Sequence, residues 1–433
     1  MTGPDAAGGS AASSDPHEPI GAAGRRLLVL TSTWPRWPGD ATTTFVRDLT
    51  VRLATLGWDP TVLAPHDPGA ARHELDGDVD VHRFRYLWPA SAQTVCYGSG
   101  ALANLRGRPI ELAKVPALVA AEQAVTVRAV RRLRPAAVHA HWLVPQGFVA
   151  GLVPGRRRPP VVVTVHGGDV FALDVPGIRS AKRLALRRAA AVTVNSSATE
   201  RAVLDLGADP DRVHRIPMGV DVDRPADPAR VQAIRAEHAV PAGPLCVLVG
   251  RVVAEKGVFD LVDAVAAAER QGRTITAVVV GEGRDREEAE QRARASGVGD
   301  KIAFVGWVDG TEVPSWLAAA DVVVAPSRTS AGGWVEAQGM AIVEAMAASR
   351  PVVATRTGGI ADAITDDETG VLVDEGDVDG LAAAILGLHD DPDRAGRLAA
   401  AARRRAVQDY AAPVIARRMS SVLASAADAG QRR

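Results

Sequence analysis

Cysteine is almost absent from this chain of 433 residues, which holds only Cys96 and Cys246. Two cysteines so far apart do not make the disulfide framework of a small secreted protein, so we expect a reducing, cytoplasmic environment. The sequence also lacks an apolar run of roughly 18 residues, the length that a membrane-spanning helix needs. Residues 1–24 are rich in Gly, Ala, Ser and Pro and lack the apolar core of a secretory signal, so we predict a disordered tail there.

An excess of charge of either sign is also missing. The proportions of 47% hydrophobic and 23% charged residues are typical of a soluble globular protein. The net charge of −1 by itself says nothing about nucleic acid or membranes, and no nucleic-acid partner is expected. The distribution is less even, because the segment 104–188 holds fifteen Lys and Arg residues against four acidic ones. That segment is either a solvated face or a surface that meets an anionic substrate or the inner face of an anionic membrane.

Short apolar runs alternate with helical stretches through the first half of the chain. Buried strands that alternate with helices predict parallel sheets with helices on both faces. The expected helices are 42–56 and 110–134. The expected strands are 27–30, 61–63, 136–139, 161–165 and 191–194.

The same alternation restarts after a proline-rich segment, with expected strands at 245–249, 276–280, 302–305, 322–325, 352–354 and 371–373. We therefore predict two Rossmann-like, doubly wound α/β domains that face each other across a cleft, since such sheets bind ligands at the carboxyl ends of their strands. The predicted division is an N-terminal domain over 25–217, a linker over 218–243, a C-terminal domain over 244–405 and a helix over 406–433. This last helix would pack back on the N-terminal domain.

Two carboxylates eight positions apart, Glu336 and Glu344, form the strongest candidate site. Gly339 lies between them, and a helix of small residues begins near Met340. Exposed amides at a helix start suit an anionic ligand, and carboxylates accept hydrogen bonds from sugar hydroxyls. The alternative is two solvent-facing acids stabilised by the helix dipole.

A second candidate follows the first strand of the second domain. Gly250 and Arg251 come directly after that strand, with Lys256 and Gly257 shortly beyond. An open α/β sheet places phosphates at this edge, where Arg offers paired hydrogen bonds and Lys a point charge. The alternative is an ion pair between Arg251 and a nearby acid such as Glu255.

In the first domain His166 ends a strand beside two glycines and is expected to face the cleft. It could donate a hydrogen bond to a sugar hydroxyl or a phosphate, or it could be a buried structural histidine. His139 and His141 lie two positions apart, but without spaced carboxylate or thiol partners they do not predict a metal site.

The order of these motifs resembles that of the family-4 retaining glycosyltransferases, whose two-domain architecture is called GT-B. The resemblance covers roughly 26–405. It rests on Thr33-Trp34-Pro35 with Phe45, on 138–141, 164–167 and 216–221, on Gly250-Arg251 through Lys256-Gly257, on 281–283, 304–306, 325–327, 336–344 and 351–354, and on Gly358-Gly359.

The resemblance implies that the protein moves a hexosyl group from a nucleotide-sugar donor to a hydroxyl acceptor, such as a lipid-linked glycan, a polysaccharide precursor or a small aglycone. Arg251 and Lys256 after Gly250 would hold the donor diphosphate, and Glu344 would bind its ribose. Residues around Val305 to Trp307 would line the base pocket. Glu336 and His166 would lie at the donor hexose, together with the amides of Gly339, Met340 and Ala341.

Two features depart from the family pattern. Ala337 and Gln338 follow Glu336, where Gly and an aromatic residue are usual, and the loop 33–44 lacks a Gly-Gly pair. The acceptor or phosphate contacts of that loop are therefore expected to use Thr side chains or Trp34.

No cofactor and no catalytic metal are expected, because the acidic clusters lie away from the expected diphosphate. Asp76, Asp78 and Asp80 fall in a polar stretch before a strand, and Asp221 and Asp223 lie in the linker.

Other functional classes would require other residues in the sequence. A non-catalytic partner subunit with this fold would have lost the motif charges, which are present here. A GT-B sugar phosphorylase or nucleotide-sugar epimerase would need phosphate or hydrolytic machinery, for which the sequence gives no sign. A dinucleotide oxidoreductase would carry G-x-G-x-x-G after its first strand, and this chain does not.

Overall fold

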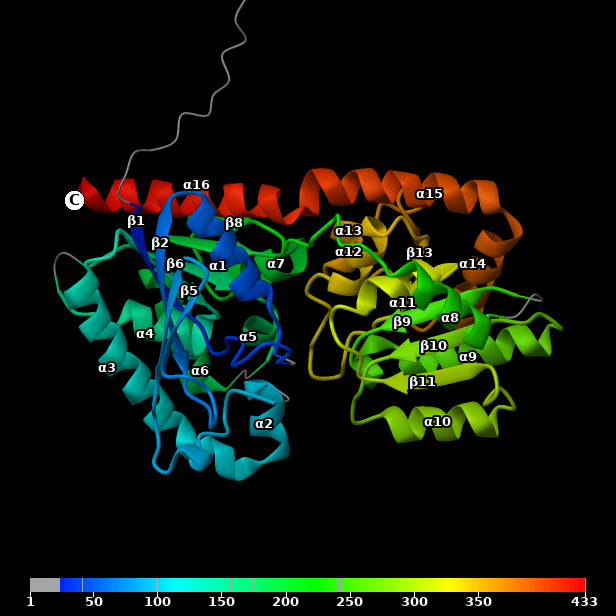
Figure 1. Ribbon diagram of the computed structural model, residues 1–433, viewed down its shortest axis with the longest axis horizontal. Coiled ribbons are helices and arrows are strands. Elements are labelled where there is room, and N and C mark those ends of the chain that lie inside the picture. Colours follow the sequence, from blue (N-terminus) through cyan, green and yellow to red (C-terminus); the bar gives the residue numbers. More distant parts are fainter. Residues whose placement is uncertain are drawn as a thin grey trace, which may run out of the picture.

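The fold is taken from a computed structural model that describes residues 24–40, 42–98, 100–155, 158–172, 175–239 and 243–432. Residues 1–23, which hold nearly all of the predicted tail, lie outside this part of the chain. Two α/β halves lie side by side, and a long C-terminal helical segment runs along both of them (Figure 1). Each half is built on one sheet.

The N-terminal half holds an eight-stranded sheet in the order β3-β4-β2-β1-β5-β6-β7-β8. Its strands are parallel apart from the antiparallel β3–β4 pair. They are β1 (Arg25–Leu30), β2 (Trp58–Pro65), β3 (His73–Asp76), β4 (Val79–Phe84), β5 (Ala137–His141), β6 (Val161–Val165), β7 (Ala191–Val194) and β8 (Val213–Arg215).

All five strands expected in this half are confirmed, whereas β3, β4 and β8 were not predicted. These three strands carry polar side chains at alternate or terminal positions, so they lack the continuous apolar runs of the central strands. The expectation that these acids precede a strand holds for Asp76 and Asp78, which come before β4, but not for Asp80, which lies within β4. Asp76 also ends β3.

Helices cover both faces of this sheet. They are α1 (Phe45–Thr55), α2 (Ala101–Gly107), α3 (Val115–Leu133), α4 (Phe148–Gly151), α5 (Gly168–Phe171), α6 (Pro176–Arg188) and α7 (Ser197–Asp205), with short turns η1 (Ala90–Ala92), η2 (Pro109–Lys114), η3 (Leu143–Gly147) and η4 (Pro210–Arg212). Alternate side chains of β1 enter two separate apolar cores, one on each face.

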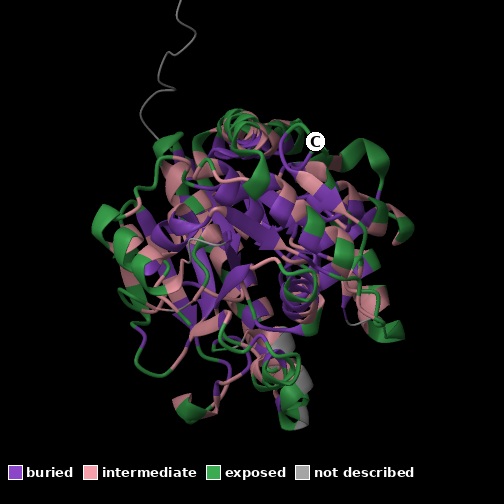
Figure 2. Ribbon diagram, turned by 90° about the vertical axis from the view of Figure 1, so that its right-hand side faces the viewer, coloured by how far each residue is buried: buried purple, intermediate pink, exposed green. Residues whose placement is uncertain are grey.

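The C-terminal half holds a six-stranded parallel sheet in the order β11-β10-β9-β12-β13-β14. All six expected strands are confirmed as β9 (Leu245–Val249), β10 (Thr276–Val280), β11 (Ile302–Gly306), β12 (Val322–Ala325), β13 (Val352–Thr355) and β14 (Val371–Val373). They form a buried centre between layers of helices (Figure 2).

The helices of this half are α8 (Pro228–His238), η5 (Ala254–Lys256), α9 (Val258–Arg270), α10 (Arg286–Ala295), α11 (Val313–Ala319), α12 (Met340–Ala347), α13 (Ile360–Ala363), α14 (Val378–Asp390) and α15 (Pro392–Arg405). Helix α8 falls inside the segment 218–243 that the sequence suggested as a linker. Its Ile234 is buried in the core of the second sheet.

The chain then crosses back to the first half through η6 (Ala406–Tyr410) and α16 (Ala412–Gln431). Helix α16 buries Ile415, Met419 and Leu423 in the N-terminal core, beside α1. The indole of Trp58 also donates a hydrogen bond to Ser420 Oγ at 2.9 Å. A segment at the end of the chain therefore completes the core of the first domain.

Both cysteines are buried and unpaired. Among the described helices, none combines the length and the apolar character that crossing a membrane requires.

Candidate active site between the two domains

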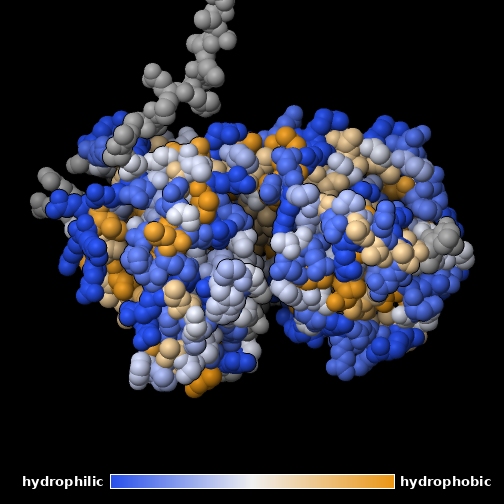
Figure 3. Space-filling view, viewed as in Figure 1, coloured by the Kyte–Doolittle hydropathy of each residue, from blue (hydrophilic) through white to orange (hydrophobic). Residues whose placement is uncertain are grey.

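A groove separates the two halves of the molecule on the face that Figure 3 shows. A methyl group added to Gly167, after β6, would come within 2.4 Å of Ala337 Cβ, in the loop after β12. One added to Gly359, after β13, would come within 2.7 Å of Ser196 Cβ, after β7. Loops of the two domains therefore touch at the predicted site, and glycine is what allows this approach.

Lys256 ends η5 beside a tightly packed turn. Gly257 follows with φ of 73°, and a Cβ there would lie 1.7 Å from the carbonyl oxygen of Pro326. The turn thereby holds Lys256 against the loop after β12.

Arg251 is exposed just after the end of β9, and within the described residues it has no ion pair. Its suggested partner Glu255 pairs instead with Arg284 at 2.7 Å.

Glu336 forms an ion pair with Lys256, although eighty positions separate them in the sequence. Glu336 is only 8% exposed, and its Oε1 accepts a hydrogen bond from the Gly339 amide at 3.2 Å. Burial raises the pKa of this carboxyl, but the charge and hydrogen bond of Lys256 outweigh it, so the pKa lies below its usual range. The site thus holds an ionised carboxylate beside a cation, and not two solvent-facing acids.

Glu344 lies in the second turn of α12, which Met340 and Ala341 begin. The first amides of a helix have no intrahelical acceptor, so those of Met340 and Ala341 are suited to an anionic ligand. Burial raises the pKa of Glu344 to about 7, and the charge of Arg224 opposes this rise. Glu344 therefore titrates near neutral pH, unlike Glu336.

His166 belongs to a group of three imidazoles below the groove. Its Nε2 lies 3.0 Å from His141 Nδ1, and the two rings stack. His139 in turn contacts Thr164 Oγ1 at 2.7 Å through Nε2. Burial, together with the charge of His139, lowers the pKa of His166 to about 3. At neutral pH His166 is therefore an uncharged donor or acceptor, and not a cation that could pair with phosphate.

Asp169 is a positioning residue that no sequence motif singled out. Its Oδ1 accepts from the His166 amide at 3.1 Å and its Oδ2 from the Leu143 amide at 2.8 Å. It therefore ties the end of β6 to the loop after β5. The strand end that precedes it, a histidine followed by two glycines, was the only available signal.

Gln338 explains one departure from the family pattern. Its Oε1 accepts from the Met218 amide at 2.6 Å, and its Nε2 donates to the Met218 carbonyl at 2.8 Å. The amide side chain matches one donor and one acceptor of the crossing segment, which an aromatic ring could not do. This residue therefore fixes the Glu336 loop to the connection between the domains.

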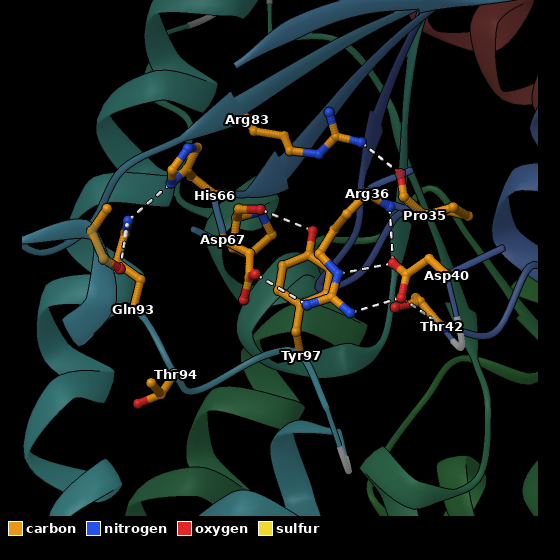
Figure 4. Close-up of polar contacts among 12 residues, drawn as sticks. Pro35, Arg36, Asp40, Thr42, His66, Asp67, Arg83, Gln93, Thr94 and Tyr97 are labelled. Carbon is orange, nitrogen blue, oxygen red and sulfur yellow. Dashed lines mark hydrogen bonds and ion pairs between the residues drawn. The ribbon is translucent and has the colours of Figure 1, made fainter. Parts of the chain in front are cut away.

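The loop after β1 is held by Arg36, which the sequence analysis missed. Its guanidinium donates to Asp40 at 2.7 Å and to Asp67 at 3.0 Å, and it lies over the Tyr97 ring (Figure 4). The Trp34 ring is only 1% exposed, so it is unable to offer its face to an acceptor. The Thr side chains of this loop remain the expected contacts.

Val305 lies near the end of β11, the edge strand of the second sheet, and is half-buried. Trp307, two residues on, is 56% exposed. The expected base-lining residues thus lie at the carboxyl end of the strand next to β10, at the same edge as Arg251.

Two family models match this chain. One, glycosyl transferases group 1, covers residues 231–405, and the other, glycosyltransferase family 4, covers residues 42–224. The chain belongs to glycosyltransferase family 4. Together the two matches contain every strand of the two sheets except β1, and every residue predicted to contact the donor.

The curated relatives of this family-4 enzyme act on different acceptors. A GDP-mannose-dependent alpha-(1-6)-phosphatidylinositol monomannoside mannosyltransferase of Mycobacterium tuberculosis is 31% identical over 69% of this chain and 79% of its own. A 2-deoxystreptamine glucosyltransferase of Streptomyces kanamyceticus is 33% identical over 58% of this chain and 66% of its own.

Solved structures share the fold. Sucrose-phosphate synthase from Thermosynechococcus elongatus matches with a TM-score of 0.75 and 22% identity, over 94% of this chain and all of the other. HepE of Anabaena, in complex with UDP and glucose, matches with a TM-score of 0.70 and 21% identity, over 93% of this chain and all of the other. The predicted GT-B architecture is confirmed. The protein is a hexosyltransferase of a retaining family, and its donor is a nucleoside diphosphate sugar.

Proposed function

We propose that this enzyme transfers a mannosyl or glucosyl group from its nucleotide donor to a hydroxyl acceptor through the Lys256–Glu336 pair. The observation that carries this proposal is that pair itself, which lies where the carboxyl ends of both sheets meet. Arg251 and Lys256 hold the diphosphate, and Glu344 accepts hydrogen bonds from the ribose. Glu336 and the neutral His166 contact the hexose.

The reaction then needs no attacking side chain. Lys256 and the amides that begin α12 stabilise the charge that develops on the leaving diphosphate. A phosphate oxygen takes the proton of the acceptor hydroxyl on the face from which the diphosphate leaves, so the anomeric configuration is retained. Glu336 orients the sugar during this step.

The testing experiment supplies the full-length enzyme with GDP-mannose or UDP-glucose and a panel of hydroxyl acceptors. Nucleoside diphosphate should be released only when an acceptor is present, and proton NMR of the first product should show the anomeric coupling of the donor. An inverted product, or release that does not depend on any acceptor, would overturn the proposal.

The names of the two relatives above define the acceptor panel, since one is a phosphatidylinositol monomannoside mannosyltransferase and the other a 2-deoxystreptamine glucosyltransferase. The panel should therefore pair an anionic lipid-linked glycan with a small polyhydroxylated aglycone and a polysaccharide precursor. Transfer to one class alone identifies the acceptor.

Turnover is expected to survive removal of divalent metal ions. The carboxylate of Glu336 already pairs with Lys256, and Arg251 and Lys256 supply the positive charge at the diphosphate that a metal would otherwise supply. Addition of excess EDTA should leave the steady-state rate nearly unchanged. Loss of activity that magnesium or manganese restores would show that a metal holds the diphosphate.

Donor binding is expected to depend on pH through Glu344. The carboxylate form is the better acceptor for ribose hydroxyls, so below its pKa of about 7 binding must first remove a proton. Affinity for the nucleoside diphosphate should therefore fall by up to about ten-fold per pH unit below 7. Calorimetry on Glu344→Gln provides the control. The nucleotide itself still titrates in this variant, but the further fall in affinity that Glu344 causes below pH 7 should be lost.

The basic segment is expected to meet anionic lipid. Arg128, Arg131 and Arg132 are exposed on α3, and Arg183 and Arg187 on the nearby α6, while Arg156 and Arg157 lie outside the described residues. Vesicle co-sedimentation should rise with the fraction of phosphatidylglycerol and fall with salt, since the screening length is about 8 Å at physiological ionic strength.

The matched control removes the same number of positive charges from the other domain. Changing Arg131 and Arg132 to alanine should reduce sedimentation, whereas changing Arg397 and Arg404 on α15 should not. If sedimentation does not change with the charge of the lipid, the basic segment is a solvated face and not a membrane-binding surface.

A further inference from the structure

A hairpin at the edge of the N-terminal sheet brings three metal-ligating side chains together. Strands β3 and β4 pair antiparallel, with His73 directly opposite His82. Asp80 lies two residues before His82 on β4, so both project from the same face of that strand. Local strand geometry therefore gathers two imidazoles and a carboxylate from a segment of ten residues.

The three side chains converge on one point. His73 Nε2 lies 2.7 Å from one oxygen of Asp80, and His82 Nε2 lies 3.0 Å from the other. The two imidazole rings stack with centroids 4.6 Å apart and an interplanar angle of 22°. One ligand atom from each residue can be chosen so that all three lie within 4.8 Å of one another.

We propose that His73, Asp80 and His82 bind a single Zn²⁺ ion. Two neutral imidazoles and one carboxylate are a ligand set that zinc accepts, with water in the fourth position of a tetrahedral site. Water has access to this position, because the His73 and His82 side chains are 59% and 42% exposed. On binding, each neutral imidazole changes tautomer: its proton passes through solvent from Nε2 to Nδ1, and the freed lone pair of Nε2 coordinates the metal.

This ion is separate from the catalytic groove. In the order of the sheet, β3 lies five strands from β6, which His166 follows, and five spacings amount to about 24 Å. The zinc therefore has no part in the transfer reaction.

Its effect is on the hairpin and on what the hairpin supports. Arg83, next to His82, donates to Glu74 on β3 and to the carbonyl oxygen of Pro35, as Figure 4 shows for Pro35. A metal that links β3 to β4 thus fastens the strand pair on which the loop after β1 rests. It also stiffens β3, an exposed edge strand that is only four residues long.

The test uses full-length protein stripped of metal with EDTA and then freed of the chelator. Calorimetry with Zn²⁺ should give one ion per chain, and Co²⁺ should give the visible absorption of a nitrogen- and oxygen-ligated ion. The variants His73→Ala, His82→Ala and Asp80→Asn should each weaken zinc binding about ten-fold or more. His214→Ala, which removes an exposed histidine on β8 at the opposite edge, should not.

A thermal melt gives a second readout, because a ligand of the folded state raises the melting temperature. Zinc should raise it in the wild type and in His214→Ala, and in none of the three hairpin variants. Absence of saturable binding, or binding that persists in the variants, would overturn the proposal and leave two histidines that only donate hydrogen bonds to Asp80. Nucleoside diphosphate affinity, unchanged in every variant, confirms that the fold is intact.

Discussion

Replacing Lys256 by alanine is expected to weaken the binding of a nucleoside diphosphate about ten-fold or more. A hydrogen bond to a charged group contributes about 1.5–3 kcal/mol, and Lys256 would supply one to the diphosphate. The variant also leaves Glu336 buried without its cation, which adds electrostatic repulsion against an anionic ligand. Isothermal titration with UDP and GDP measures the loss.

Two further variants separate this effect from damage to the fold. Arg251→Ala removes a cation that has no ion pair among the described residues, so it should lose affinity to a similar degree without lowering the melting temperature. Arg284→Ala removes a nearby cation that pairs with Glu255 and should bind like the wild type. Wild-type affinity in both Lys256→Ala and Arg251→Ala would remove the diphosphate assignment.

The second large effect is expected for Glu336→Gln, which should lower turnover by roughly 10²–10³, the range found when one preorganised polar group is removed from an active site. Glutamine keeps the shape of the side chain and an acceptor for the Gly339 amide. It removes the charge that pairs with Lys256 and the stronger acceptor for a sugar hydroxyl.

The comparison of ligands makes this prediction specific. If Glu336 orients the hexose, the variant should lose turnover and affinity for the intact donor, while its affinity for the nucleoside diphosphate alone should change little. Glu368→Gln, at an exposed acid of the same domain, is the matched control and should behave as wild type. Wild-type turnover in Glu336→Gln would exclude a role at the sugar.

The central strands could be predicted because the residues of each strand are enough to identify it as a strand. Runs such as Val161–Val165 and Val322–Ala325 are continuous, β-branched and buried on both faces, so the sequence alone distinguishes them from helices. This signal fades in β3, an edge strand that alternates exposed and half-buried positions, and in β4 beside it, where buried positions alternate with half-buried ones over most of the strand. That is why the hairpin with His73 and His82 was missed.

The sequence predicted which residues form the candidate site, but not which of them form ion pairs with one another. The ends of strands β6, β9 and β12 pointed to His166, Arg251 and the Glu336 loop, because parallel strands bring their carboxyl ends to one edge. That Lys256 pairs with Glu336, and Arg284 instead of Arg251 with Glu255, depends on side chains from different loops. No local pattern encodes those distances.

By itself the sequence determined that the chain forms two doubly wound sheets, and the order of its motifs determined the family, because hydrophobic periodicity and short motifs are local properties of the chain. Only the tertiary structure decided that α16 completes the core of the first domain and that Gln338 holds the Met218 segment. It also decided that His141 lies against His166. These contacts join residues that are far apart along the chain, and they exist only once packing has fixed how the elements lie against one another.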